Sequence, residues 1–223
     1  MSASGVNGAA AADDRLESLL NRYPGVEAFE YEHHFEGDSK LLRGYVGVPS
    51  RDPKAPPVPL VIVAHTAIGP QEDFILSKVR ALTEAGVVAF ACDCFGAPDL
   101  VFGQEKEECN RQFKENRKLL QGRMQAGLSS VCSSSDFPCI DETRVAAIGY
   151  CFGGKAVLDL CRAGISSLKG VVSFHGILDH PRELDHDRAI ETKVLAFNGF
   201  ADPYVPTEKK QAFMEEMEVR PVL

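Results

Sequence analysis

A glycine-rich turn around Cys151 has the residue types that best fit catalysis. The sequence GYCFGGK at 149–155 follows an apolar run and precedes a helical pattern, which predicts a strand-to-helix turn. Glycines allow close backbone approach there, and the residue at such a turn projects from the carboxyl edge of a sheet. Because a helix begins at this point, its free N–H groups favour a thiolate. The pattern predicts a nucleophile at Cys151, with the N–H of Phe152 as an oxyanion donor.

Two other interpretations of this turn remain open. The segment nearly matches the phosphate-binding pattern G-x-x-x-x-G-K-[ST], but Ala156 stands where the pattern has the hydroxyl that binds Mg²⁺. The turn could also be purely structural, with Cys151 as inert as Cys161, which falls within the following helix. Thiol reactivity and nucleotide titration separate the three interpretations.

Composition and charge exclude several classes of protein. The 223 residues are 44% hydrophobic and 25% charged, with a formal net charge of −8, which disfavours nucleic-acid and membrane partners. We find no apolar run as long as a membrane-spanning helix and no signal-peptide pattern at the N-terminus. The seven cysteines form no C-x-x-C pair and lack the spacing of a zinc site. We therefore expect a cytoplasmic protein with reduced thiols and no bound metal.

Strand and helix patterns alternate along the chain, which predicts an α/β fold with a mainly parallel sheet flanked by helices. Residues 1–24 are predicted to be a mobile N-terminal tail and lead-in, and residues 25–223 a single domain. The predicted strands are 27–36, 41–48, 60–64, 87–92, 144–149, 170–174 and 193–197, the first two forming a hairpin. The predicted helices are 71–85, 104–127, one that follows the glycine-rich turn and runs through Arg162, and 206–218. The last has Phe213, Met214 and Met217 as its buried stripe.

The segment VAAIGYCFGGKAVLDL at 145–160 resembles the nucleophile segment of the dienelactone hydrolase family. The similarity continues in LVIVAHTAIGPQEDF at 60–74, GVVAFACDCFG at 86–96, VVSFHGIL at 171–178 and VLAFNGFADPYVP at 194–206. It covers roughly residues 25–220. The resemblance implies an α/β-hydrolase fold, Cys151 as nucleophile, no cofactor, and a small-molecule carboxylic ester or lactone as substrate.

The resemblance also implies roles for residues away from the turn. Asp202 matches the triad acid, although an aspartate ahead of Pro203 could instead be a turn or helix-capping residue. The backbone N–H of Ala67 matches the second oxyanion donor, beside that of Phe152. Thr66 stands where dienelactone-type members carry a glutamate near the thiol. Glu72 could supply that carboxylate, or it could be a solvated residue at the start of a helix.

Three further side chains are candidates for the pocket. His65 follows a predicted strand, so we expect it to face the pocket as a substrate-binding residue, with a hydrogen-bonded loop histidine as the alternative. Arg123 resembles an arginine in the cap-side helix of relatives, where it could bind a substrate carboxylate; a solvated helical arginine is the alternative. We interpret His175 as structural support for the sheet edge, with pocket lining as its second interpretation.

A triad of this kind needs a histidine after its acid. The six histidines at 33, 34, 65, 175, 180 and 186 all precede Asp202. Another helix, loop and strand would place the family's histidine at about position 230 or later. The resemblance thus implies a hydrolase without its general base, last strand and last helix, with His65 as the candidate substitute. The alternative is a catalytically silent α/β protein that acts by binding.

Overall fold

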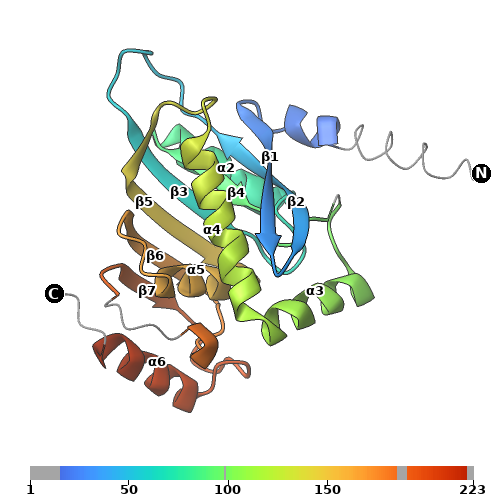
Figure 1. Cartoon of the computed structure of the whole chain (residues 1–223), viewed down its shortest axis with the longest axis vertical. Coiled ribbons are helices and arrows are strands. Elements are labelled where there is room, and N and C mark those ends of the chain that lie inside the picture. Colours follow the sequence, from blue (N-terminus) through green and yellow to red (C-terminus); the bar gives the residue numbers. More distant parts are fainter. Residues whose placement is uncertain (1–15, 98, 185–189, 220–223) are drawn as a thin grey trace, which may run out of the picture.

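In the part of the chain that the structure describes, seven strands form one sheet in the order β1-β2-β4-β3-β5-β6-β7, which runs across the molecule (Figure 1). The computed structural model describes residues 16–97, 99–184 and 190–219, so the predicted tail at 1–12 and His186 lie outside the described residues. The neighbours from β4 through β3, β5 and β6 to β7 pair in parallel, whereas β1 and β2 are antiparallel. The strands are β1 Val26–Phe35, β2 Asp38–Gly47, β3 Val58–Ala64, β4 Val88–Cys92, β5 Ile140–Tyr150, β6 Leu168–Phe174 and β7 Lys193–Phe197.

The predicted hairpin at the start of the sheet is confirmed. Strands β1 and β2 pair along their whole length, from Val26 opposite Gly47 to Phe35 opposite Asp38. Glu36 and Gly37 form the connection with φ values of 50° and 90°. Two successive residues with positive φ give the tight turn whose twist matches that of paired strands.

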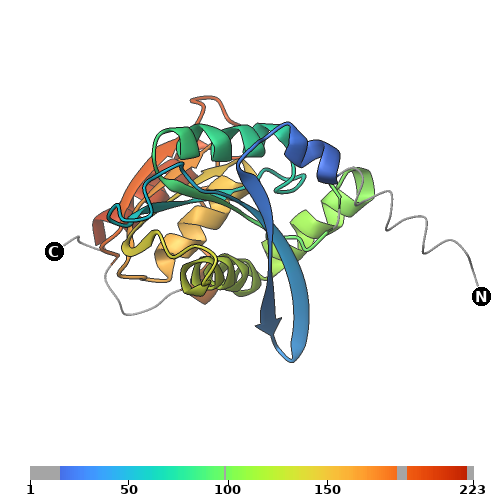
Figure 2. The ribbon, with the colours of Figure 1, turned by 90° about the horizontal axis from the view of Figure 1, so that it is seen from above.

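Helices cover both faces of the sheet, as the alternating pattern predicts (Figure 2). One face carries α2 and the short helix at 16–21, and the other carries α4 and α5. The lead-in is therefore packed, because Leu16, Leu19, Leu20 and Tyr23 contact the α2 side of the core. None of the described helices is both long and apolar enough to cross a bilayer. The helices are α2 Asp73–Glu84, α3 Gly103–Glu115, α4 Arg117–Ser133, α5 Phe152–Arg162 and α6 Thr207–Val219, with a 3-10 turn at Arg182–Leu184.

The structure corrects two predicted helices. The single helix expected at 104–127 is two helices, because Asn116 leaves helical geometry and its side chain caps α4 by accepting the N–H of Leu119 at 2.8 Å. In α6 the predicted stripe is wrong at Met214, which is 61% exposed. Glu216 is buried instead, because it pairs with Arg162 of α5.

Candidate active site

Cys151 lies at the turn between β5 and α5, as the sequence predicts. It is the exposed member of the seven free cysteines, and its backbone has φ 55° and ψ −109°. A non-glycine residue in this region is strained, and such strain concentrates at functional sites. Its N–H donates to the carbonyl of Phe174 at 2.8 Å, and its own carbonyl accepts the N–H of Gly154 at 3.0 Å. These bonds fix the turn and leave the thiol at the carboxyl edge of the sheet.

The glycines around Cys151 are required because neighbouring backbone atoms leave no space for a Cβ atom. A Cβ at Gly149 would lie 2.0 Å from the carbonyl oxygen of Gly153, and one at Gly153 would lie 2.1 Å from that of Ala64. A Cβ at Gly154 would lie 2.7 Å from the Cα of Gly176. No Cβ fits at such distances, so only glycine lets α5 start this close to β3 and β6.

The predicted oxyanion donors lie on adjacent segments of this edge. Strands β3 and β5 are in register up to the pair Ala64 and Gly149, so the loops that follow them are neighbours. The ring of His65 stacks on that of Phe152 with centroids 5.5 Å apart, which holds the β3 loop against the start of α5. Within the described residues, the N–H groups of Ala67 and Phe152 donate to no protein acceptor. Both donors are therefore free to bind an external oxygen atom.

Glu72 turns back onto the loop that carries Ala67. Its Oε2 accepts the hydroxyl of Thr66 at 2.5 Å, and both residues are partly buried. Of the two interpretations of Glu72, the structure favours the one that brings a carboxylate to this loop. The carboxylate of Glu72 is therefore hydrogen-bonded to the residue that precedes Ala67.

His65 does not face the pocket, which corrects our expectation of a substrate contact. It is fully buried, its Nε2 accepts the N–H of Cys94 at 3.1 Å, and its Nδ1 lies 2.6 Å from the carbonyl oxygen of Thr66. Burial lowers the pKa of His65, so the ring is neutral and donates through Nδ1. With both nitrogens engaged, His65 joins the β3 and β4 loops beneath the turn and offers no free base.

Arg123 is buried rather than solvated. Its guanidinium donates to the carbonyls of Cys94 and Phe95 and lies 5.0 Å from the centre of the Phe113 ring. Its Nε is buried without a hydrogen-bond partner among the described residues, and burial lowers its pKa from the usual value. Phe113 in turn contacts Phe152, with centroids 5.6 Å apart, so aromatic rings separate Arg123 from the Cys151 turn.

Arg123 instead lines a cavity of about 210 Å³ between the β1–β2 hairpin and helices α3 and α4. The cavity is lined by His33, Phe35, Glu36, Asp38, Lys40, Gln112, Asn116, Leu119 and Arg123. None of the residues predicted for the nucleophile turn belongs to this lining. The structure therefore separates Arg123 from Cys151 and Asp202, which lie at the sheet edge.

Asp202 lies next to a histidine that we expected to be structural. The Asp202 side chain is 4% exposed, and its Oδ1 accepts the N–H of Tyr204 at 2.9 Å. Its Oδ2 lies 3.2 Å from the Nε2 of His175. That oxygen makes no aligned hydrogen bond to any described residue. The sequence signal that could have found this contact is the place of His175 directly after β6, beside the strand that ends at the nucleophile turn.

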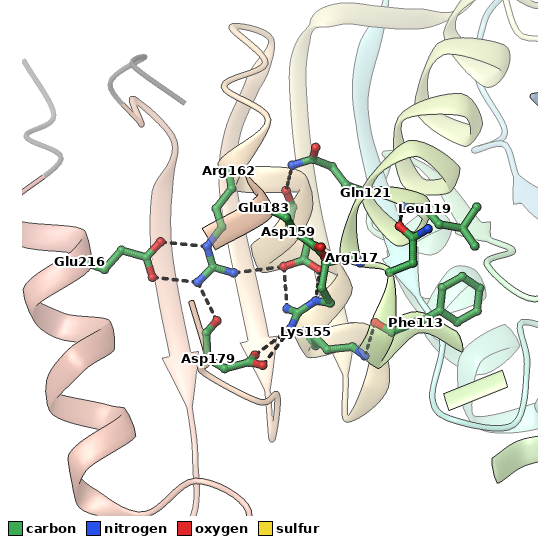
Figure 3. Close-up of polar contacts among 11 residues, drawn as sticks. Phe113, Arg117, Leu119, Gln121, Lys155, Asp159, Arg162, Asp179, Glu183 and Glu216 are labelled. Carbon is green, nitrogen blue, oxygen red and sulfur yellow. Dashed lines mark hydrogen bonds and ion pairs between the residues drawn. The ribbon is translucent and has the colours of Figure 1, made fainter. Parts of the chain in front are cut away.

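Buried ion pairs tie the helices of the site together (Figure 3). Arg117 of α4 donates to both carboxylate oxygens of Asp159 in α5 at 2.7 Å. Arg162 of α5 pairs with both oxygens of Glu216 in α6 at 2.8 Å, and it also contacts Asp159 at 3.1 Å. Because α5 begins after Cys151 and α6 follows the loop of Asp202, these pairs fix the two halves of the site relative to each other.

The described residues contain no cluster of three or more side chains arranged to hold a metal ion. At the Cys151 edge the structure brings together an exposed thiol on a strained backbone, two free backbone N–H groups, and a buried carboxylate beside an exposed imidazole. Such groups can attack a carbonyl, bind the resulting oxyanion and move a proton.

Comparisons with known proteins identify the family of the chain. Residues 42–222 match the model of the dienelactone hydrolase family. The uncharacterized protein K02A2.1 of Caenorhabditis elegans is 35% identical over 101 residues, a stretch that spans 45% of this chain and 62% of that protein, less than two thirds of it. Carboxymethylenebutenolidase 1 of Cupriavidus pinatubonensis is 26% identical over 181 residues, covering 77% of this chain and 71% of that one.

A solved structure has the same fold. The dienelactone hydrolase-like promiscuous phosphotriesterase P91, from metagenomic libraries, superposes with a TM-score of 0.74 at 28% identity, covering 88% of this chain and 78% of that one. The family match includes β3 to β7 and the turn at Cys151. This chain belongs to the dienelactone hydrolase family.

Proposed function

We propose that this protein hydrolyses carboxylic ester or lactone bonds of a small molecule, with Cys151 as the nucleophile. The observation that carries the proposal is the exposed thiol in a strained turn, beside the free N–H groups of Phe152 and Ala67. Family membership supports hydrolysis. A relative is named a carboxymethylenebutenolidase, and a butenolide is an unsaturated lactone, which supports the substrate class.

In this proposal the reaction has two halves. The thiolate of Cys151 attacks the carbonyl carbon, and the N–H groups of Phe152 and Ala67 bind the oxyanion. The C–O bond then breaks, an imidazolium oriented by Asp202 gives the former thiol proton to the leaving alkoxide, and a thioester remains on Cys151. The same imidazole then removes a proton from the water that attacks the thioester. The C–S bond breaks, the proton returns to the sulfur, and the carboxylic acid is released.

The compartment and partners are part of the same proposal. All seven cysteines are free, which supports a reducing, cytoplasmic compartment. The net charge of −8 supports a small-molecule substrate rather than a nucleic acid or an anionic membrane surface.

Reaction with p-nitrophenyl acetate tests the nucleophile. We expect a burst of nitrophenolate of at most one equivalent, with the acetyl group found on Cys151 by mass spectrometry. The variant Cys151→Ala should lose the burst, whereas the control Cys139→Ala, which removes a partly buried thiol elsewhere, should keep it. A burst that survives Cys151→Ala would contradict the proposal. Folded protein without any acylation would favour the alternative of a catalytically silent binding protein.

A further inference from the structure

The imidazole of His175 lies against a buried carboxylate oxygen of Asp202 that has no other partner among the described residues. Asp202 is a nearly fully buried carboxylate, and its Oδ2 has no hydrogen-bond partner among the described residues. A buried carboxylate oxygen normally accepts at least one hydrogen bond, because desolvation without one is costly. The group facing that oxygen is the Nε2 of His175, at 3.2 Å. The side chain of His175 is 61% exposed, so its ring can rotate to align this contact.

We propose that His175 is the general base for Cys151 in this chain and that Asp202 orients it. The proposal rests on Cys151 being the nucleophile. With Nε2–H donated to Asp202, the tautomer is fixed and the lone pair on Nδ1 is available to the thiol. This role goes beyond the structural one expected for His175 from the sequence.

Strand register puts His175 beside the nucleophile. Strands β5 and β6 are parallel and paired up to Tyr150 and Phe174, so Cys151 and His175 are the next residues at the same level. Neighbouring strands lie about 4.8 Å apart, and the N–H of Cys151 donates to the carbonyl of Phe174 at 2.8 Å. Both residues leave their strands with positive φ, 55° at Cys151 and 58° at His175. Both side chains are exposed at this edge of the sheet.

The backbone of His175 is held firmly while its ring stays exposed. Its N–H donates to the carbonyl of Phe197 at 2.7 Å, and the next carbonyl, that of Gly176, accepts the side chain of Asn198 at 2.9 Å. The end of β7 and the residue after it therefore anchor the backbone at His175 and Gly176. A fixed backbone with a rotatable ring suits a group that must meet the thiol and then the attacking water.

The proton path balances as follows. Nδ1 of His175 takes the thiol proton of Cys151, and the sulfur bonds to the acyl carbon while the carbonyl electrons move to oxygen. When the C–O bond breaks, the imidazolium returns the proton to the leaving alkoxide. Nδ1 then takes a proton from water as hydroxide adds to the thioester. The C–S bond breaks, the thiolate receives that proton, and the acid is released.

Substitutions at position 175 test the proposal without disturbing the turn. Asparagine tolerates positive φ, so His175→Asn keeps the backbone while removing the base. His175→Gly also suits that φ and leaves space for added imidazole. The matched control is His34→Gln, which changes an exposed histidine on β1. Circular dichroism and thermal melting verify that each variant is folded.

We expect His175→Asn to slow acylation by p-nitrophenyl acetate about 100-fold, within the range for loss of a general base. His34→Gln should react at the wild-type rate, and imidazole should restore part of the rate of His175→Gly. Wild-type acylation and turnover in folded His175→Asn would overturn the role of His175 while leaving Cys151 as nucleophile. A burst that persists in Cys151→Ala would instead overturn the proposed function, and the role of His175 with it.

Discussion

Lys155 places its ammonium group in the aromatic cluster behind the Cys151 turn. It is 6% exposed, and its Nζ lies 4.8 Å from the centre of the Phe152 ring and 3.4 Å from the carbonyl oxygen of Phe113. Burial lowers the pKa of Lys155 to about 8, with the nearby charge of Arg117 acting in the same direction. An ammonium group held in this way is not presented to a phosphate at the turn, which argues against the phosphate-loop interpretation.

The free energy of unfolding should depend on pH because Lys155 is buried. In the unfolded chain Lys155 keeps its proton up to about pH 10.5, whereas in the folded chain it loses it near pH 8. Between these values the unfolded state binds more protons, so this group makes stability rise with pH. We expect the free energy of unfolding of the wild type, relative to Lys155→Met, to increase by up to about 3 kcal/mol across this window. Urea titrations of both proteins at pH 7.5 and 10.5 measure the difference, and parallel values would contradict it.

At the scale of elements, a buried ion pair holds helix α6 to α5. Arg162 is fully buried, and the side chain of Glu216 is 3% exposed. The pair is bidentate, with both contacts at 2.8 Å (Figure 3). Lys210, also on α6, donates to the carbonyls of Gly199 and Phe200, which precede Asp202. The position of the Asp202 loop thus depends on how α6 docks.

Removing one partner of this pair should destabilise the protein. Glu216→Gln leaves the buried charge of Arg162 with Asp159 alone, so we expect a loss of about 3 kcal/mol in the free energy of unfolding. The matched change Glu215→Gln, one residue earlier and exposed, should cost less than about 0.5 kcal/mol. Urea unfolding followed by circular dichroism gives both values. Equal stability of the two variants would mean that the buried pair does not hold α6.

At the scale of the whole molecule, the sheet is unevenly covered. Strand β7 is the edge strand of the described sheet, and its residues alternate between exposed and partly buried. Leu195 and Phe197 are 51% and 50% exposed, while Val194 and Ala196 pack against the core. An exposed apolar edge strand offers unpaired backbone groups and apolar side chains to another chain.

We expect the 223-residue chain to self-associate through this edge. Leu195→Lys should lower the average mass measured by light scattering at high protein concentration, because a charge on an edge strand opposes strand pairing. Met214→Lys is the matched control, since it places a lysine at an exposed apolar position of α6 rather than of strand β7. If both variants and the wild type give the same mass, β7 is not the associating surface.

Local patterns predicted much of the fold because they depend on neighbours in sequence. The turn at Cys151 was predictable from its glycines, and the helix α5 from the apolar period that follows. The break at Asn116 also had a local signal, an N-cap residue, but a continuous charged pattern concealed it. The prediction for Met214 was wrong because an apolar stripe does not establish which face of a helix packs against the core. In α6 that face is set by the pairing of Glu216 with Arg162.

The sequence by itself determined the α/β class, the strand-to-helix turn and the identity of the thiol that it presents. Only the tertiary structure decided which polar side chains lie near that thiol and which are buried elsewhere. It buried His65 and Arg123 and brought His175 to Asp202. The physical reason is that these contacts join loops after different strands, and their distances follow from sheet register and helix docking. Residue spacing along the chain contains no direct measure of either.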